Sequence, residues 1–322
     1  MEDSPLWTLG NLRFDPDTTD ANGVLWFLAE EEGFFGAPST NAETTQRLGA
    51  HGAYRSPGYK TERTISLKGN AFAGSYRALR TAVNQITGVL SDPFEPAALT
   101  CYAETGPLTC DVYLDGDILT TPLGTNSPGI EWSLQVLAPD PRKYSTVAQS
   151  MRAEVPRADT GDGLEFMATP DTTTFSTFST PAAGGHSGLD FTTHGGLLFG
   201  ESNATGIMQL VNAGTAPTNP VYTLYGPLTD PTLTATTGGL RSELTYNARL
   251  GPGEFVVIDP AAPSVLLAGT ASRRHLLNPA QFAGFAVPGT SRDGGTLSVG
   301  LTHQGASTDG GYVVATYRNA WF

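Results

Sequence analysis

The chain has 322 residues, a length that suits two domains of ordinary size. Hydrophobic residues make up 39% and charged residues only 15%, which excludes a disordered chain because such a chain has the opposite balance. The net charge of -13 disfavours stable binding to DNA or RNA, since counterion release requires a basic surface.

Turn-forming residues and side-chain periodicity predict the secondary structure. The 38 glycines and 23 prolines, with threonine abundant throughout, favour many short strands joined by turns. Apolar residues at every second position predict half-buried strands. We expect such strands at residues 23–28, around Ile65 and Leu67, at 111–119, around Trp132, Leu134 and Val136, at 206–211, 221–225 and 254–258, around Leu297, Val299 and Leu301, and at 312–317. The expected fold class is mainly β with antiparallel sheets.

Residues 75–90 depart from this pattern. Leu79, Val83, Ile86 and Leu90 recur at helical spacing, and polar side chains fall elsewhere on the helical wheel. Ser75 has a side chain that caps helix N-termini well. We therefore expect one amphipathic helix that packs on the neighbouring sheet, with Val83 and Ile86 buried.

Two prolines indicate the boundary between the domains. Pro139 and Pro141 close the strand around Trp132, because proline removes a donor from the ladder and restricts the residue before it. We expect a first domain at residues 1–145, a connector and extended loop at 146–188, and a second domain at 189–322. The polar stretch 158–188 belongs to this connector.

The cysteines leave two alternatives open. Cys101 and Cys110 are the only two, too few for a cysteine metal site or a disulfide scaffold. A hairpin centred on residues 104–107 would place them directly opposite each other. A cross-strand disulfide fits this arrangement, and two reduced, packed thiols are the expected state.

Acidic motifs give no support for an enzyme. Glu30, Glu31 and Glu32 come just after a predicted strand, whereas paired catalytic carboxylates need a concave, partly apolar setting. We interpret them as a charged hairpin tip. The segment from Asp159 to Gly163 resembles part of a calcium loop but lacks its full ligand spacing, so we interpret it as a solvated turn.

The histidines also lack a catalytic pattern. They are scattered through the chain as His51, His186, His194, His275 and His303. None forms the i,i+4 pair on a helix that hydrolytic zinc sites use. The sequence also lacks a G-x-S-x-G elbow, a phosphate-binding loop and a dinucleotide fingerprint. We therefore expect no catalytic, cofactor-binding or metal-binding residues.

Aromatic side chains gather around the acidic triplet and near residue 322. The two groups are Trp26, Phe27, Phe34 and Phe35, and Tyr312, Tyr317, Trp321 and Phe322. Most of them are expected in the core. Exposed members would suit a subunit interface or a platform on which sugars stack.

The order of features resembles a known family. A polar loop through residues 47–52 is followed by Tyr59, the strand 63–69 and the helix; a strand then ends at residues 132–141, before Arg142, Lys143 and Tyr144. The second half carries, in order, Asn212, Gly214, Pro217, Pro220, Tyr225, Gly226, residues 254–259, Pro288 and Gly289. This order resembles the distal tail proteins of siphophages, often called Dit, and related minor tail proteins.

The resemblance implies a structural virion protein, not an enzyme, at the tip of a long non-contractile phage tail, assembled in the host cytoplasm. Its first domain would be a β-sandwich with the tail-tube fold and one amphipathic helix, and about six copies would form a ring. Its second domain would be a galectin-like β-sandwich. The implied partners are the tail tube protein, a tail-tip hub or tail-associated protein, and as a further candidate the tape measure protein. Neither a membrane nor bound nucleic acid is expected, and Glu30 to Glu32 would be candidates for an acidic channel lining.

Two other interpretations stay open. A glycan-binding adhesin would use the lectin-like second domain, and would need exposed aromatic residues on a concave face with convergent polar groups. A carbohydrate-degrading enzyme would need two carboxylates that converge in a cleft. Sugar-dependent stabilisation of a monomer would favour the adhesin over the ring.

Overall fold

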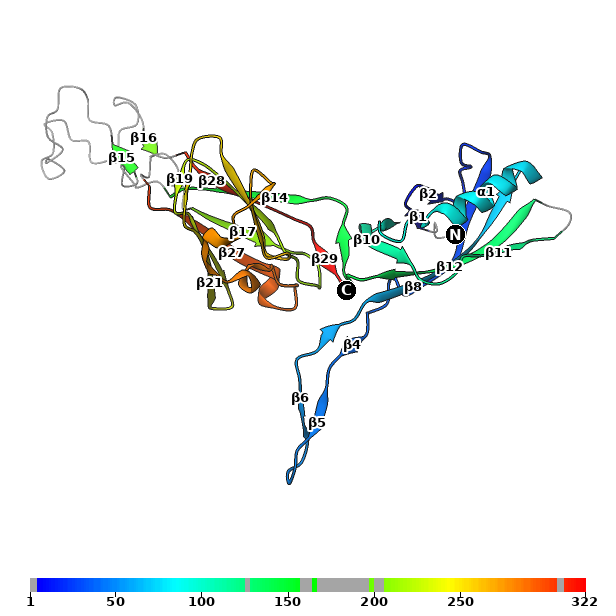
Figure 1. Cartoon of the computed structure of the whole chain (residues 1–322), viewed down its shortest axis with the longest axis horizontal. Coiled ribbons are helices and arrows are strands. Elements are labelled where there is room, and N and C mark those ends of the chain that lie inside the picture. The colour runs from blue at the N-terminus through cyan, green and yellow to red at the C-terminus, as the bar shows by residue number, and fades with distance from the viewer. Residues whose placement is uncertain (1–4, 125–127, 157–163, 167–196, 200–205, 306–309) are drawn as a thin grey trace, which may run out of the picture.

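The computed structural model describes residues 5–124, 128–156, 164–166, 197–199, 206–305 and 310–322. Two β-rich units lie side by side along the long axis, and a slender hairpin projects from the first unit near the junction (Figure 1). No helix in the described part of the chain is long and apolar enough to cross a membrane.

The first unit is built on one antiparallel sheet with the order β2-β1-β9-β10-β12-β8-β3. At its margins β11 pairs with β12, and β13 pairs with β10. The strands are β1 (Leu6–Leu9), β2 (Leu12–Phe14), β3 (Val24–Glu32), β8 (Arg63–Ala73), β9 (Ala97–Ala103), β10 (Gly106–Leu114), β11 (Leu119–Pro122), β12 (Gly129–Ala138) and β13 (Lys143–Ser145).

This sheet curls until strands distant in its order face each other. Phe14 of β2 stacks on Trp132 of β12, with 4.9 Å between the ring centroids, and meets Trp26 of β3 edge to face. The alternating residues Ile65 and Leu67 of β8 are fully buried on the same inner side. Burial of each large apolar side chain stabilises the fold by about 1.5–3 kcal/mol. The alternating apolar residues predicted from the sequence therefore form the core inside the curled sheet.

Helix α1 (Tyr76–Gly88) packs on the inner side of β8 and β3. The hydroxyl of Ser75 accepts a hydrogen bond from the backbone N–H of Ala78 at 3.2 Å, as expected for an N-cap. Ile86 is fully buried, but Val83 is only half-buried. The prediction for Val83 was wrong because Ala82, a small residue that the apolar pattern did not single out, takes the central position.

Cys101 and Cys110 are both buried and free, but they are not directly opposite. In the β9–β10 hairpin Cys101 pairs with Leu108, and Cys110 pairs with Leu99. The turn is centred between Ala103 and Gly106, one residue earlier than the sequence suggested, so the thiols are offset diagonally. The expected opposition was wrong, and the expected packed thiols are found.

The second unit consists of two antiparallel sheets that face each other. The order of one is β14-β28-β18-β23-β24-β25 and that of the other β17-β27-β20-β21-β26. Leu297, Val299 and Leu301 of β27 alternate into the core between them and are fully buried. The fold class expected from the sequence, mainly β with two antiparallel β units and one helix, is confirmed.

The strands of the second unit are β14 (Gln149–Glu154), β17 (Ile207–Val211), β18 (Val221–Tyr225), β20 (Thr232–Thr237), β21 (Leu240–Tyr246), β23 (Phe255–Asp259), β24 (Ser264–Leu267), β25 (Ala271–Ser272), β26 (Leu277–Ala280), β27 (Thr296–Thr302) and β28 (Tyr312–Tyr317). Smaller elements are β15 (Leu164–Phe166), β16 (Leu197–Phe199), β19 (Leu228–Thr229), β22 (Arg249–Leu250), η1 (Arg274–Leu276), η2 (Phe282–Phe285) and η3 (Asp293–Gly295). Strand β14 lies inside the stretch 146–188 expected as connector, so that stretch already contains a strand of the second unit.

The final described strand returns to the first unit. β29 (Ala320–Trp321) pairs with β13, so that Lys143 lies beside Trp321 and Tyr144 beside Ala320. Arg142, next to β13, donates from Nη1 to the carbonyl of Pro217 in the second unit at 3.0 Å. The two units are therefore joined by strand pairing as well as by the chain itself.

Asn212 attaches β29 to the second unit. Its buried side-chain amide donates to the carbonyls of Ala216 and Pro288, and its Oδ1 accepts from the N–H groups of Gly214 and Ala320. Gly214 is required here, because a Cβ at this position would lie 1.8 Å from the carbonyl oxygen of Ala320. The Asn212–Gly214 motif in the sequence is therefore a packing motif of the junction.

Ile86→Asp tests the assigned face of the helix. The substitution buries an unpaired carboxylate and removes apolar contacts whose loss alone costs about 2–5 kcal/mol. We expect this variant to be insoluble or unfolded, whereas Arg80→Ala, on the exposed face, changes the free energy of unfolding by less than about 0.5 kcal/mol. Equal melting temperatures for the two variants would show that the faces are wrongly assigned.

Candidate functional site

The acidic triplet lies inside a strand, so the expected hairpin tip was wrong. Glu30, Glu31 and Glu32 are the last residues of β3 and pair with β8 after a bulge that follows Leu28. Glu31 accepts a hydrogen bond from the N–H of Phe34, while Glu30 and Glu32 are exposed. The bulge preserves pairing where the sequence alone suggested that the strand had ended.

The described histidines and acidic residues form no metal site. No group of three or more His, Cys, Asp or Glu side chains within the described residues is arranged to hold a metal ion. His51 and His275 are exposed, and the half-buried His303 accepts from the N–H of Gly305 at 3.2 Å. The segment from residue 159 to 163, and histidines 186 and 194, lie outside the described residues.

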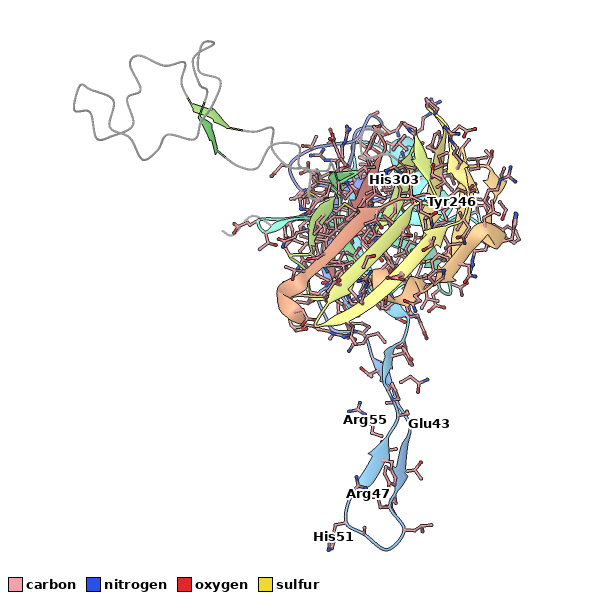
Figure 2. The ribbon with its side chains drawn as sticks, turned by 90° about the vertical axis from the view of Figure 1, so that its left-hand side faces the viewer. Glu43, Arg47, His51, Arg55, Tyr246 and His303 are labelled. Carbon is pink, nitrogen blue, oxygen red and sulfur yellow. The ribbon has the colours of Figure 1, made fainter. Side chains whose placement is uncertain are left out.

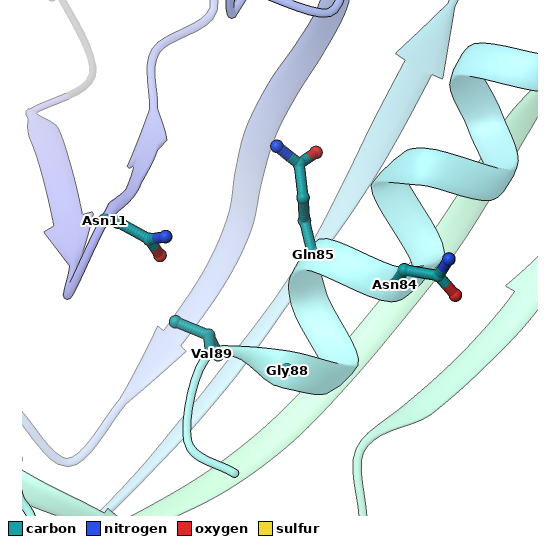
Figure 3. A pocket seen from close by; sticks show the side chains of 5 residues that line it. All are labelled: Asn11, Asn84, Gln85, Gly88 and Val89. Atoms are coloured by element: carbon teal, nitrogen blue, oxygen red, sulfur yellow. The ribbon is translucent and has the colours of Figure 1, made fainter.

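A hollow of about 380 Å³ lies between the β1–β2 turn and the end of α1 (Figure 3). It is lined by Asn11, Asn84, Gln85, Gly88 and Val89. The buried Oε1 of Gln85 has no hydrogen-bond partner. The lining offers amide groups but no side chain that titrates near neutral pH, so it carries no acid–base chemistry.

The most exposed part of the described chain is a β-hairpin, residues 39–62, which we call the arm. Its strands pair as β4 (Thr40–Asn41) with β7 (Tyr59–Lys60), and β5 (Thr44–Gln46) with β6 (Ala53–Arg55). The stretch expected as a polar loop is thus a two-stranded projection (Figures 1 and 2). All residues of β4, β5 and β6 are exposed, so the arm has no core of its own.

The arm presents aromatic, apolar and basic side chains to solvent. Leu48 is fully exposed, and Tyr54 and Tyr59 are 66% and 76% exposed. The guanidinium carbon of Arg47 lies 4.7 Å from the centre of the Tyr54 ring. Arg55 lies nearer the base of the arm than Arg47, and His51 lies at its tip (Figure 2). Exposed rings and cations of this kind are typical of protein interfaces, which makes the arm a candidate binding surface.

The arm begins at residues 33–38, which we call the root; Phe34 and Pro38 are buried there, and Arg63 binds the segment. Arg63 is 2% exposed, and its Nη1 donates to the carbonyl oxygens of Gly33, Phe34 and Gly36. Its Nε donates to the carbonyl of Pro141 at 3.0 Å, so the same guanidinium also holds the linker between the units.

Lys143 binds the same root from the linker side. It is 4% exposed, and its Nζ donates to the carbonyl of Phe34 at 2.8 Å and lies 5.3 Å from the centre of that ring. Nearby, Lys60 donates to the carbonyl of Pro38 at 2.9 Å. Within the described residues neither Arg63 nor Lys143 has an ion pair with a carboxylate, so backbone carbonyls are the partners of both cations, while the buried Nη2 of Arg63 has no hydrogen-bond partner.

Burial shifts the titration of the groups at the root. Desolvation, followed by repulsion from Arg63, lowers the pKa of Lys143 to about 8. Desolvation raises the pKa of the Cys110 thiol to about 12 and that of Cys101 to about 11. The thiols are therefore protonated at neutral pH and serve as core residues.

The sequence did not reveal this cluster, although a signal was present. The chain has only three lysines, Lys60, Lys68 and Lys143, and two of them bind carbonyls of the root. Arg63 pairs with Ala138 across the β8–β12 ladder, which brings it to the linker. Predicting that pairing from the sequence would have placed Arg63 and Lys143 together.

The outer face of the first sheet is acidic. Helix α1 and strands β1 and β2 share the core on the inner side, so the outward side chains of β3, β8, β10 and β12 lie on the opposite face. Five exposed carboxylates and one lysine project from it: Glu30, Glu32, Asp111, Asp115, Glu131 and Lys68. Lys68 already pairs with Glu30 at 3.0 Å. We call this surface the acidic face.

The second unit carries an aromatic ladder on its six-stranded sheet. The rings of Tyr312 and Tyr225 stack at 4.7 Å, and Tyr225 lies 5.7 Å from Phe255. Arg152 covers the far side of Tyr312, with its guanidinium carbon 3.7 Å from the ring centre. Tyr317, in contrast, is buried and donates its hydroxyl to the carbonyl of Val211. The ring faces of both ladder tyrosines are therefore occupied.

Comparison with known proteins gives a likeness in structure. No protein-family model matches the chain, and no curated protein sequence matches it. The chain is similar to the crystal structure of the Dit protein of phage SPP1, described as a paradigm of the hub adsorption apparatus in phages that infect Gram-positive bacteria. The TM-score is 0.61 with 10% identity, and the match covers 99% of both chains.

Two structures of the phage P2 baseplate in its activated conformation, with Ca and with Sr, also match, each with a TM-score of 0.49. Their identities are 10% and 9%, covering 98% of this chain and 98% and 97% of theirs. The likeness to SPP1 Dit shows that this chain has that fold over its full length, in agreement with the resemblance found from the order of motifs.

Lys143→Met tests the buried cation at the root. Lysine titrates near 10.5 in the unfolded chain and near 8 in the fold, so below pH 8 the fold carries the full cost of the buried charge. Between these values the fold has lost the proton and the unfolded chain has not, so the stability contributed by Lys143 rises with pH. The free energy of unfolding of Lys143→Met minus that of the wild type should fall by up to about 3 kcal/mol from pH 7 to pH 10.

Subtracting the wild-type free energy of unfolding from that of Lys143→Met also cancels the contribution of the two thiols, which changes with pH in the opposite direction to that of Lys143. Because the fold raises the pKa of Cys101 and Cys110, their contribution to stability decreases above pH 9 in both proteins. Urea unfolding at several pH values gives the difference directly. A difference that does not change with pH would contradict the lowered pKa of Lys143.

Proposed function

We propose that the chain is a structural virion protein that forms a ring at the distal end of a long non-contractile phage tail and links the tail tube to the tail-tip hub. The observation that carries the proposal is the full-length likeness to SPP1 Dit, at a TM-score of 0.61. SPP1 Dit is described as a paradigm of a hub adsorption apparatus. The order of sequence motifs points independently to the same family.

The edges of the first sheet suit a head-to-tail ring. Among the described strands β3 pairs with β8 alone, apart from one bridge at Leu25, and β11 pairs with β12 alone. A long free edge and a short free edge on opposite sides are two different surfaces of one subunit. Such heterologous surfaces close into a ring when the rotation between copies allows it. Unpaired edges of this kind would otherwise promote uncontrolled association.

The proposed role is non-enzymatic. The described residues supply an arm, a free strand edge and an acidic face rather than converging acid and base groups. The proposed partners are further copies of this chain, the tail tube protein and a tail-tip hub or tail-associated protein, with the tape measure protein as a further candidate. The proposed location is the tail tip of the virion, after assembly in the host cytoplasm.

A glycan-binding adhesin is the second candidate, and the aromatic ladder is the observation that bears on it. Tyr225 and Tyr312 stand beside the polar pair Arg152 and Glu154, which are linked at 3.0 Å. Sugar stacking needs a free ring face, however, and both tyrosine faces are covered. The ring is therefore the better supported function. A monomer whose melting temperature rises with added oligosaccharide would reverse this preference.

The mass of the purified protein tests the ring. A monomer has a mass of 33.8 kDa, and about six copies would give about 200 kDa. Light scattering after size-exclusion chromatography should show this species to increase with protein concentration. A constant mass of one chain at every concentration, together with its absence from rings in intact tails, would sink the proposal.

The charge of the ring predicts that it does not retain DNA. Each copy carries a net charge of -13. A wall without a basic coat lets DNA pass, because few counterions are released on contact. We expect no shift of duplex DNA in a gel titration at about 50 mM salt, where phosphate contacts are strongest. Tight binding that disappears at higher salt would overturn the passive passage.

A further inference from the structure

The arm has no core of its own to stabilise its conformation. It is a two-stranded ribbon whose residues in β4, β5 and β6 are all exposed, and such ribbons are only marginally stable in water. Leu48, Tyr54 and Tyr59 would gain free energy from burial. The arm is therefore a surface whose contacts are completed by a partner.

The root shows that the arm is held in one direction. Arg63 and Lys143 are buried without ion pairs, and removing such cations from water costs several kcal/mol each. Together they bind three carbonyls of the root and one of the linker. An arm fixed relative to both units suits a partner in a fixed position, as in a symmetric assembly.

The charge of the arm is opposite to that of the rest of the chain. Arg47, Arg55 and Lys60 against Glu43 and Glu62 give the arm a net charge of +1, which leaves -14 for the remaining residues. Residues 44–61 contain no carboxylate. A basic and apolar arm on an acidic chain fits another copy of the same chain.

We propose that the arm docks on the acidic face of a second copy, with Arg47 and Arg55 facing its carboxylates. Asp115 and Glu131 are exposed there, and the nearest lysine, Lys68, is already paired with Glu30. Exposed Phe72 of β8 projects from the same face and offers apolar contact for the arm's tyrosines. This inference rests on the proposed assembly and adds the surfaces through which copies meet.

Duplex DNA is the competing occupant. A basic ribbon with interleaved aromatic residues resembles a nucleic-acid contact. The arm offers only two arginines beyond its base, however, and DNA affinity grows with the number of phosphates neutralised. The fully exposed Leu48 also fits a protein surface better than a phosphate backbone.

Charge reversal tests the docking. Sedimentation velocity at low and high salt compares the wild type with Arg47→Glu/Arg55→Glu, with Arg77→Glu/Arg80→Glu, and with Asp115→Arg/Glu131→Arg. The helix pair is the matched control, because both arginines are exposed and the charge change is equal. We expect self-association of the arm variant and of the face variant to weaken about tenfold or more, and that of the helix variant to stay unchanged. A variant that combines the arm and face charge reversals should regain self-association.

The outcomes separate this inference from the ring itself. Normal rings from the arm variant would overturn the docking and leave the proposed function intact. Loss of association in the arm variant without rescue by the face reversal would also overturn it, since the acidic face would not be the partner. A wild type that stays monomeric would remove both proposals. A gel shift of duplex DNA abolished by Arg47→Glu/Arg55→Glu would replace the second copy by nucleic acid.

Discussion

The structure depends on two buried cations at the point where the arm, the first sheet and the linker meet. Arg63 and Lys143 share the carbonyl of Phe34, and Arg63 also binds the carbonyl of Pro141. Buried cations normally require carboxylate partners, because desolvation costs more than most single hydrogen bonds return. Here backbone dipoles take that role, so the cations fix the path of the backbone.

The contacts around Arg63 and Lys143 also fix the position of the second unit relative to the first. Lys143 is also the first residue of β13, which pairs with β29, and β29 is held to the second unit through Asn212 and Ala320. Lys143 therefore takes part both in holding the arm and in placing the second unit. A subunit that must present several surfaces at fixed angles needs such a relation, since a ring closes only at one rotation between copies.

Local periodicity predicted the helix, many of the strands and much of the core. The alternation at Leu297, Val299 and Leu301 gave a buried strand, and Ser75 gave the start of the helix. Two of the failures depended on register. The hairpin turn lay one residue from its expected place, which moved Cys101 away from Cys110, and a bulge kept the glutamates within β3. Local sequence patterns could not predict that Arg63 and Lys143 bind the root. Gly33, Arg63 and Lys143 come together only after β8 and β12 have paired.

The central claim is that this fold serves assembly rather than catalysis. Negative-stain electron microscopy of the purified chain at high concentration tests it most directly, because the image reports symmetry as well as mass. We expect closed rings of about six subunits, each with its second unit on the rim. A field of separate two-lobed particles at every concentration, with no ring containing this chain in intact tails, would contradict it.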